Sequence, residues 1–215
     1  MKFKSREHAA QLLAERLRAA YRNKNPLVLG VPRGAVPMAK IIADALGGEL
    51  DVVLVHKLSH PEQSELAIGA IDENGNAFVS QWAADLDPEY LAAEKQRQLS
   101  LLRERRGKYT PLRAPIDARG RIVIVVDDGI ATGSTMTAAL RAIRAQKPKK
   151  LIGAVAVASP EAARAMLHDC DAMVCLNVPM EFYAVGQFFD DFSQVTDEDV
   201  VAILKQDVEN VSAAG

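Results

Sequence analysis

Apolar positions along the chain follow two alternating patterns. Some segments repeat apolar residues every three or four positions, as an amphipathic helix does, and others are continuous β-branched runs, typical of strands covered on both faces of a parallel sheet. The helical spacing occupies residues 7–21, 35–46, 134–145 and 160–167. The apolar runs occupy residues 27–31, 51–56, 121–126, 151–158 and 172–176. Because strands and helices alternate along most of the chain, the sequence predicts an α/β fold with a doubly wound parallel sheet.

Two segments interrupt this alternation. Residues 58–71 are polar and precede a hairpin signal at residues 73–75, and a loop of this length in a compact domain is usually functional or mobile. Residues 80–115 predict a helical insertion, because Asp87 is a suitable N-cap and Pro88 suits the first helical turn. We therefore expect a flexible loop at 58–71 and an inserted helix after it.

The composition is that of a single domain that spans residues 1–215. Apolar residues make up 49% of the chain, and 26 basic side chains nearly balance 28 acidic ones. With a formal charge of −2, no overall field favours nucleic acid or an anionic membrane as a partner. No apolar run approaches the roughly 20 residues that cross a bilayer, and the N-terminal segment is charged throughout. We expect a cytoplasmic protein that binds no membrane.

The sequence VIVVDDGIATGST, residues 123–135, carries the clearest chemical signal. A strand ends in two carboxylates and leads through a glycine-rich turn into a helix, and ligands of open α/β sheets bind at such carboxyl ends. Residues 131–135 would present backbone N–H groups and hydroxyls at the helix N-terminus, which suits a phosphate. Asp127 and Asp128 would repel that phosphate, so they must serve a neighbouring part of the ligand, and the vicinal hydroxyls of a sugar fit. The chain has neither a P-loop nor a dinucleotide-binding glycine motif.

This segment resembles the diphosphate-sugar motif of the type I phosphoribosyltransferases, an acidic pair followed by a turn of the form xxxTGxT. The resemblance implies that the chain binds 5-phosphoribosyl 1-diphosphate with Mg²⁺ and transfers the phosphoribosyl group to an acceptor. It implies that Asp127 and Asp128 bind the ribose 2′- and 3′-hydroxyls, take part in catalysis and contribute to the Mg²⁺ site. It places Ala131, Thr132, Gly133, Ser134 and Thr135 around the 5′-phosphate and makes Gly129 a further substrate-binding residue.

A second segment, VPRGA at residues 31–35, resembles the loop with which this family binds diphosphate. By that resemblance Pro32, Arg33 and Gly34 contact the diphosphate. Arg33 supplies the positive charge and is a catalytic candidate, and the Pro32–Arg33 peptide bond is cis. The alternative is an ordinary turn between a strand and a helix.

Two further catalytic candidates follow in the chain. Lys57 resembles the basic residue that adenine-type members place before their mobile loop, where it could reach the diphosphate; the alternative is a solvated lysine at a strand end. Residues 58–71 take the place of the family's flexible catalytic loop, which closes over the site and excludes water. Glu65 is the acid or base that this loop offers, and a solvated carboxylate is the alternative reading.

Residues 177–193 are expected to form a small hood on the acceptor side. Within them FYAVGQFFDDF, residues 182–192, resembles a stretch of the hypoxanthine-guanine phosphoribosyltransferases. The resemblance implies that Tyr183 stacks on an acceptor ring and that Asp190 ligates Mg²⁺; the alternative is that these aromatic side chains form core. The chain departs from those enzymes at Ala131, where they carry an aspartate. The acceptor is therefore left open, as a nucleobase or a related nitrogen heterocycle.

A different class of function is also open. Some relatives of this family keep the diphosphate-sugar site but act as sensors that bind RNA or another protein. The basic cluster that would support such a sensor is Arg103, Arg105, Arg106 and Lys108. A solvated helix face explains this cluster more simply, so we expect an enzyme that binds no nucleic acid. Since closed dimers are the commonest assembly, we also expect a homodimer through the opening helix or the inserted helix.

Overall fold

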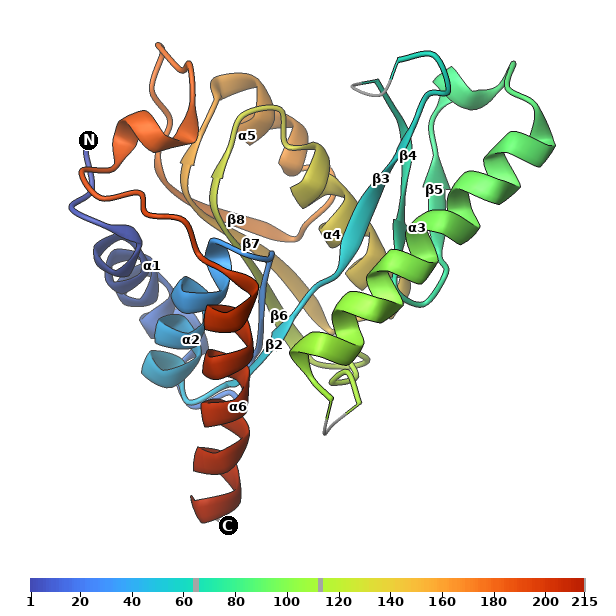
Figure 1. The fold of residues 1–215 in the computed structure, drawn as a ribbon. Helices are drawn as coiled ribbons and strands as arrows, with labels where there is room; N and C mark the ends of the chain where they lie inside the picture. The colour runs from blue at the N-terminus through green and yellow to red at the C-terminus, as the bar shows by residue number, and fades with distance from the viewer. Residues whose placement is uncertain (64–65, 112–113, 215) are drawn as a thin grey trace.

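A five-stranded parallel sheet forms the centre of the structure (Figure 1), a computed structural model that describes residues 1–63, 66–111 and 114–214. The strands run in the order β2-β1-β6-β7-β8, and all neighbours are parallel. Their bounds are β1 Leu27–Gly30, β2 Glu49–Val52, β6 Ile122–Ile130, β7 Lys150–Ala158 and β8 Ala172–Asn177. Helices connect the strands, and the predicted doubly wound α/β fold is confirmed.

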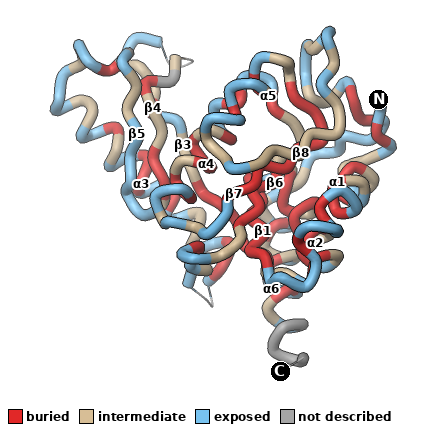
Figure 2. The backbone as a smooth tube through the Cα atoms, turned by 180° about the vertical axis from the view of Figure 1, so that it is seen from behind, coloured by how far each residue is buried: buried red, intermediate tan, exposed pale blue. Residues whose placement is uncertain are grey.

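Helices cover both faces of this sheet. One face carries α1 (Arg6–Tyr21), α2 (Ala35–Leu46) and α6 (Asp197–Ala214), and the other carries α4 (Ser134–Ala145) and α5 (Pro160–Met166). Because side chains alternate along a strand, the central strands supply apolar residues to two separate cores, and Figure 2 shows these strands buried. Within the described ranges, none of the helices has the length and apolar character that a membrane crossing requires.

A second, three-stranded antiparallel sheet stands beside this core (Figure 1). It consists of β3 (Val55–Ser59), β4 (Ala67–Asp72) and β5 (Ala77–Val79), in that order. The inserted helix is α3 (Pro88–Tyr109), which packs against β3 and β4, and α4 of the core contacts the same two strands. Asp87 caps α3 through its side chain, as predicted. Two short 3-10 helices complete the chain: η1 (Gln81–Ala83) and η2 (Val185–Phe188).

The prediction of a flexible loop over residues 58–71 was wrong in its bounds. β3 continues to Ser59 and β4 begins at Ala67, so the connection between them is confined to residues 60–66. Leu58 is fully buried in the small sheet. The polar composition of the segment concealed two short strands, because each of them buries few apolar side chains.

Two other elements differ from the prediction. The expected strand 51–56 is divided, since β2 ends at Val52 and β3 begins at Val55 in a different sheet. Val53 and Leu54 between them are buried as well, so the apolar run gives no sign of the change of sheet. The C-terminal helix α6 was not predicted.

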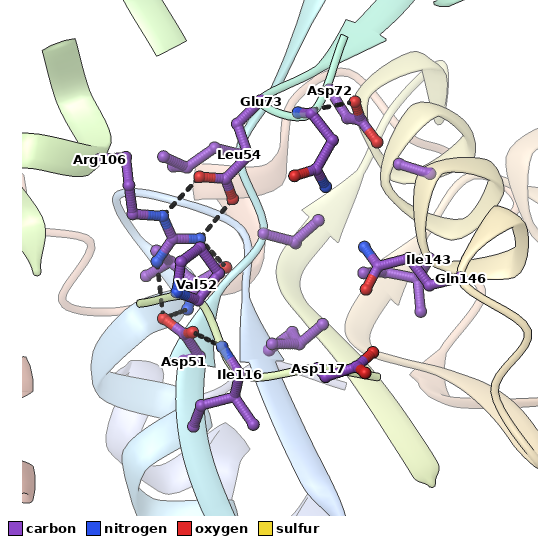
Figure 3. Close-up of a pocket in the computed structure, with 15 residues that line it drawn as sticks. Asp51, Val52, Leu54, Asp72, Glu73, Arg106, Ile116, Asp117, Ile143 and Gln146 are labelled. Atoms are coloured by element: carbon purple, nitrogen blue, oxygen red, sulfur yellow. Dashed lines mark hydrogen bonds and ion pairs between the residues drawn. The ribbon is translucent and has the colours of Figure 1, made fainter. Parts of the chain in front are cut away.

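Arg106 of α3 joins the small sheet to the core (Figure 3). Its guanidinium donates to Asp51 of β2 at 2.8 Å and pairs with Glu73 in the turn between β4 and β5. It also donates to the carbonyl oxygen of Val52 at 3.0 Å, while Asp51 accepts the backbone N–H of Ile116 at 3.0 Å. These residues line a pocket of about 260 Å³. The arginine and both carboxylates are nearly buried, and their pairing links the small sheet to the core.

Candidate active site

The acidic pair, Asp127 and Asp128, lies near the end of β6 and beside the end of β1. Oδ1 of Asp127 accepts the backbone N–H of Asp128 at 2.8 Å, and Oδ2 of Asp128 accepts from Nε of Arg6 at 2.8 Å. Burial raises the pKa of both carboxyls; the charge of Asp128 raises the pKa of Asp127 further, and Arg6 opposes the rise in both. Such a pair is stabilised in its ionised form when a cation or hydrogen-bond donors approach it.

The turn after β6 presents polar groups at the start of α4. Gly133 adopts the left-handed conformation with a φ of +76°, and α4 begins at the next residue, Ser134. The hydroxyls of Thr132 and Ser134 share a hydrogen bond of 3.1 Å, and both side chains are exposed. Ser159 donates to the carbonyl oxygen of Ala131 at 2.7 Å and so fixes the turn. With the backbone N–H groups of the first helical turn, this surface suits an anionic ligand.

The predicted diphosphate loop, residues 31–35, connects β1 with α2 and packs directly on the acidic pair. The Pro32–Arg33 peptide bond is cis, as predicted. A β-carbon placed on Gly34 would lie 2.4 Å from Oδ2 of Asp128, so a larger residue there would have to displace this side chain. The structure therefore brings this loop and the acidic pair together, because β1 and β6 are neighbours in the sheet.

Arg33 has a carboxylate neighbour that no sequence pattern indicated. Its NH1 lies 3.9 Å from Oδ1 of Asp197, and both side chains are partly exposed. The hydroxyl of Tyr109 donates to the same carboxylate at 2.5 Å. Asp197 begins α6 and Tyr109 ends α3, so two elements remote in sequence converge behind the diphosphate loop.

Lys57 and the start of α4 line one pocket of about 340 Å³. Ser134 and Thr135 contribute from α4, and His56 contributes with Lys57 from β3. Gln98 of the inserted helix completes the lining and bonds Nδ1 of His56 at 2.9 Å. The structure thus brings Lys57 and the predicted phosphate turn to one pocket, while contact of Lys57 with a diphosphate stays a prediction.

The aromatic residues of the predicted hood have two kinds of surroundings. Phe182 and Phe188 pack against each other with ring centroids 5.3 Å apart, as core residues do. Tyr183 is 85% exposed, so its ring is available to a ligand, and stacking on an acceptor stays a prediction. A β-carbon on Gly129 of β6 would lie 2.6 Å from Val185 of η2. This close approach places the hood segment against the strand that carries the acidic pair.

A preformed metal cage is not seen in the described part of the chain, where no three His, Cys, Asp or Glu side chains converge on a metal position. Asp190 forms an exposed ion pair with Lys2 at 2.6 Å. It therefore does not join Asp127 and Asp128 in a cluster of three carboxylates. Glu65, the candidate acid or base, lies outside the described residues.

A parallel sheet that carries an acidic pair and a glycine-rich turn at the end of one strand, with a second loop at the end of its neighbour, is the type I phosphoribosyltransferase fold. The chain belongs to this family: residues 3–191 match the family described as Phosphoribosyl transferase domain.

Several known proteins are similar to this chain. TT1426 from Thermus thermophilus is 44% identical, with a TM-score of 0.87 and a match that covers 96% of this chain and 99% of that chain. "Putative phosphoribosyl transferase Rv0571c" from Mycobacterium tuberculosis is 38% identical over 216 residues, which cover 99% of this chain and 48% of that protein. The chain therefore spans about half the length of this relative. A purine phosphoribosyltransferase from Pyrococcus horikoshii is 17% identical, with a TM-score of 0.46 over 83% of this chain and 93% of that chain. This last likeness is too distant to identify an acceptor.

Proposed function

We propose that the chain is an enzyme that transfers the 5-phosphoribosyl group of 5-phosphoribosyl 1-diphosphate to a nitrogen of a nucleobase-like heterocycle and releases diphosphate. The observation that carries this proposal is the contact between the loop after β1 and the acidic pair on β6. Gly34 of the predicted diphosphate loop meets Asp128 of the acidic pair, and the phosphate turn begins on the same strand as that pair. Membership in the phosphoribosyl transferase family supports the same reaction class.

The order of polar groups across the site matches the order of groups along this substrate. The loop with Arg33 would face the diphosphate, the acidic pair would accept hydrogen bonds from the ribose hydroxyls, and the turn at Thr132 to Thr135 would hold the 5′-phosphate. Lys57, in the pocket that also contains Ser134 and Thr135, adds positive charge on the small-sheet side. A substrate with one sugar and two separated anionic groups uses all of these features at once.

Mg²⁺ fits the donors that the site offers. This ion prefers oxygen ligands and is commonly held by one or two carboxylates together with substrate phosphates and water. Asp127 and Asp128 supply carboxylate oxygens beside the diphosphate loop, and Asp190 would join them directly or through water after leaving Lys2. When bound, the ion would reduce the negative charge of the diphosphate.

The reaction that we propose exchanges one bond at the anomeric carbon for another. The bond from C1 to the diphosphate oxygen breaks and its electron pair leaves with the diphosphate, whose charge Arg33 would balance. A nitrogen of the acceptor bonds to C1 from the opposite face, and its proton passes to the departing diphosphate or to water. The acidic pair would hold the ribose in place while C1 develops positive charge. Catalysis would come mainly from positioning and from electrostatic stabilisation of the leaving group.

We favour the enzyme over the RNA-sensing alternative because of the surroundings of the basic cluster on α3. Arg106 is nearly buried between Asp51 and Glu73, so it is not on a free basic surface. Arg105 contacts Nε2 of His56 at 3.2 Å, and Lys108 pairs with a glutamate one helical turn away. The basic end of α3 therefore consists largely of side chains that are engaged within the protein.

Calorimetric titration with 5-phosphoribosyl 1-diphosphate and Mg²⁺, followed by a diphosphate-release assay over a panel of nucleobases and related heterocycles, tests the proposal. We expect binding, and release with at least one acceptor. The double variant Asp127→Asn with Asp128→Asn should lose both, while Asp85→Asn, at an exposed position, should keep both. Binding without release from any acceptor would indicate a sensor, and absence of binding would overturn the proposal.

A further inference from the structure

Arg6 is the first residue of α1, yet its side chain reaches the acidic pair, which is remote in the sequence. Nε donates to Oδ2 of Asp128 at 2.8 Å across 122 positions of the chain, and the arginine side chain is 11% exposed. The same side chain borders the diphosphate loop, because the β-carbon position of Gly34 lies 3.1 Å from Nε and NH2 of Arg6. Arg6 thus contacts the acidic pair and approaches the loop that meets it.

Two further contacts hold the guanidinium from the other side. NH1 donates to the carbonyl oxygen of Ser193 at 2.6 Å. The guanidinium carbon lies 3.8 Å from the centre of the Phe192 ring, so the planar group lies over an aromatic face. Phe192 and Ser193 are the last two residues of the predicted acceptor-side hood. Arginine suits this place because one planar group combines several directed donors with a stacking surface, which lysine does not offer.

We propose that Arg6 is a positioning residue that holds the Asp128 carboxylate in the orientation that accepts the ribose hydroxyls, an inference that rests on the proposed function. The guanidinium is itself held by the Ser193 carbonyl and the Phe192 ring, so it has little freedom to follow a rotating carboxylate. Rotation of Asp128 would break a charge-assisted hydrogen bond. A carboxylate that is already oriented binds a diol without the cost of ordering it on binding.

Titration with two probes separates this role from a general attraction of anions. The first probe is 5-phosphoribosyl 1-diphosphate, which carries the diol, and the second is inorganic diphosphate, which lacks it. Each probe is titrated with and without Mg²⁺, and the two are compared in its absence, because Asp128 is also a proposed ligand of that ion. Arg6→Gln should weaken binding of the first probe about tenfold or more and change binding of the second by less than about twofold, since the lost interaction is one hydrogen bond to a charged group on the diol side. Arg6→Lys keeps the charge but loses the directed N–H donors of the guanidinium and its stacking on Phe192. Its affinities for the two probes should therefore match those of Arg6→Gln.

A matched control is available at the other end of β6, the strand that carries Asp128. Arg121, which precedes β6, pairs with Glu49 and donates to the carbonyl oxygen of Asn25 at 3.1 Å. Arg121→Gln removes a comparable ion pair away from the acidic pair and should leave both affinities unchanged. Phe192→Leu keeps the arginine but removes the aromatic ring on which it stacks. It should selectively lower the affinity for 5-phosphoribosyl 1-diphosphate, by a smaller factor than Arg6→Gln does. This variant tests the inference if Arg6→Gln does not fold.

The outcomes distinguish the two proposals. Absence of binding of 5-phosphoribosyl 1-diphosphate to the wild-type protein would overturn the proposed function and this inference with it. Wild-type binding that is unchanged in Arg6→Gln would overturn the positioning role alone. Equal weakening of both probes, or full affinity in Arg6→Lys, would also overturn it, because either result would make Arg6 a source of positive charge and not of orientation.

Discussion

Gly34 lies so close to Asp128 that a β-carbon at position 34 would fall 2.4 Å from the carboxylate oxygen Oδ2. The backbone of Gly34 has a φ of −57° and a ψ of −33°, which any residue adopts, so what opposes a larger residue is the contact with the side chains of Asp128 and Arg6. The contact joins a loop after β1 to a carboxylate on β6, and it makes the spacing between the two predicted ligand-binding segments a fixed property of the fold.

Gly34→Ala should therefore disturb the site more than the fold. The new methyl group displaces Asp128 or Arg6, and we expect the affinity for 5-phosphoribosyl 1-diphosphate to fall about tenfold or more, as for the loss of a hydrogen bond to a charged group. Calorimetric titration measures this change. The control is Gly107→Ala, inside α3, where the β-carbon position has no neighbour within 4 Å. That variant should be stabilised by about 0.5–1 kcal/mol and should bind normally.

Asp127→Asn should raise stability while it removes binding. Burial and the charge of Asp128 raise the pKa of Asp127 well above its ordinary value, so keeping this carboxyl ionised at neutral pH opposes folding. Asparagine retains the oxygen that accepts the backbone N–H of Asp128. We expect a higher Tm than the wild type at neutral pH, with a gain that shrinks as the pH falls toward 3.8, the ordinary pKa of an aspartate. An unchanged or lower Tm at neutral pH would contradict this account of the pair.

His56 should make stability depend on pH. Nδ1 donates to Gln98 and Nε2 accepts from Arg105, so the ring is neutral in the folded state. Burial lowers the pKa of His56 below its ordinary value of 6.5, and the charges of Arg105 and Arg97 lower it further. The unfolded chain then binds more protons, so stability is highest above pH 6.5 and declines as the pH falls through that value.

His56→Gln should flatten this part of the stability profile, because glutamine can keep a donor and an acceptor without taking up a proton. Urea denaturation at a series of pH values measures the slope. His168→Gln, at an exposed position, serves as the control and should keep the wild-type profile. A wild-type slope that persists in His56→Gln would assign the pH dependence to another group.

The chemistry that lies in one stretch of chain was predictable from the sequence. The acidic pair, the glycine-rich turn and the start of α4 occupy consecutive positions, so their order along a strand, turn and helix fixes how they face a ligand. The resemblance assigned residues 31–35 and the acidic pair to neighbouring parts of one ligand, and the structure brings Gly34 against Asp128 because β1 lies beside β6.

The rest of the site depends on contacts between distant segments. Arg6, Asp197 and Tyr109 reach the site through contacts with residues far away in the sequence, and a local pattern of apolar and polar residues carries no information about such partners. The same limit explains why the strands of the small sheet were not predicted. Its strands β3 and β4 are short and bury few side chains, so the polar composition of residues 58–71 was a poor guide to their structure.

Arg106 is expected to be the residue on α3 whose loss most weakens the fold. Arg106→Met leaves Asp51 and Glu73 nearly buried without their shared cation. Removing one partner from a buried ion pair costs about 3–5 kcal/mol, and urea denaturation should show a loss of this size. Arg103→Met, on an exposed position of the same helix, should change stability by less than about 0.5 kcal/mol. Equal stability of the two variants would show that the small sheet is held by its apolar contacts.

Asp197 should compete with an anionic ligand for Arg33, since its carboxylate lies 3.9 Å from NH1 of that arginine. Asp197→Asn removes the competing charge but keeps an oxygen that can accept from the hydroxyl of Tyr109. Affinity for inorganic diphosphate with Mg²⁺ should then rise by up to about fivefold, because partly exposed ion pairs contribute about 0.2–1 kcal/mol. Glu198→Gln removes the same charge at the next position, and a smaller rise there than in Asp197→Asn separates a specific effect on Arg33 from a general change of field. The gain should diminish as salt is added, since exposed charges are screened. A lower affinity in Asp197→Asn would mean that the aspartate orients Arg33 toward the diphosphate and does not compete for it.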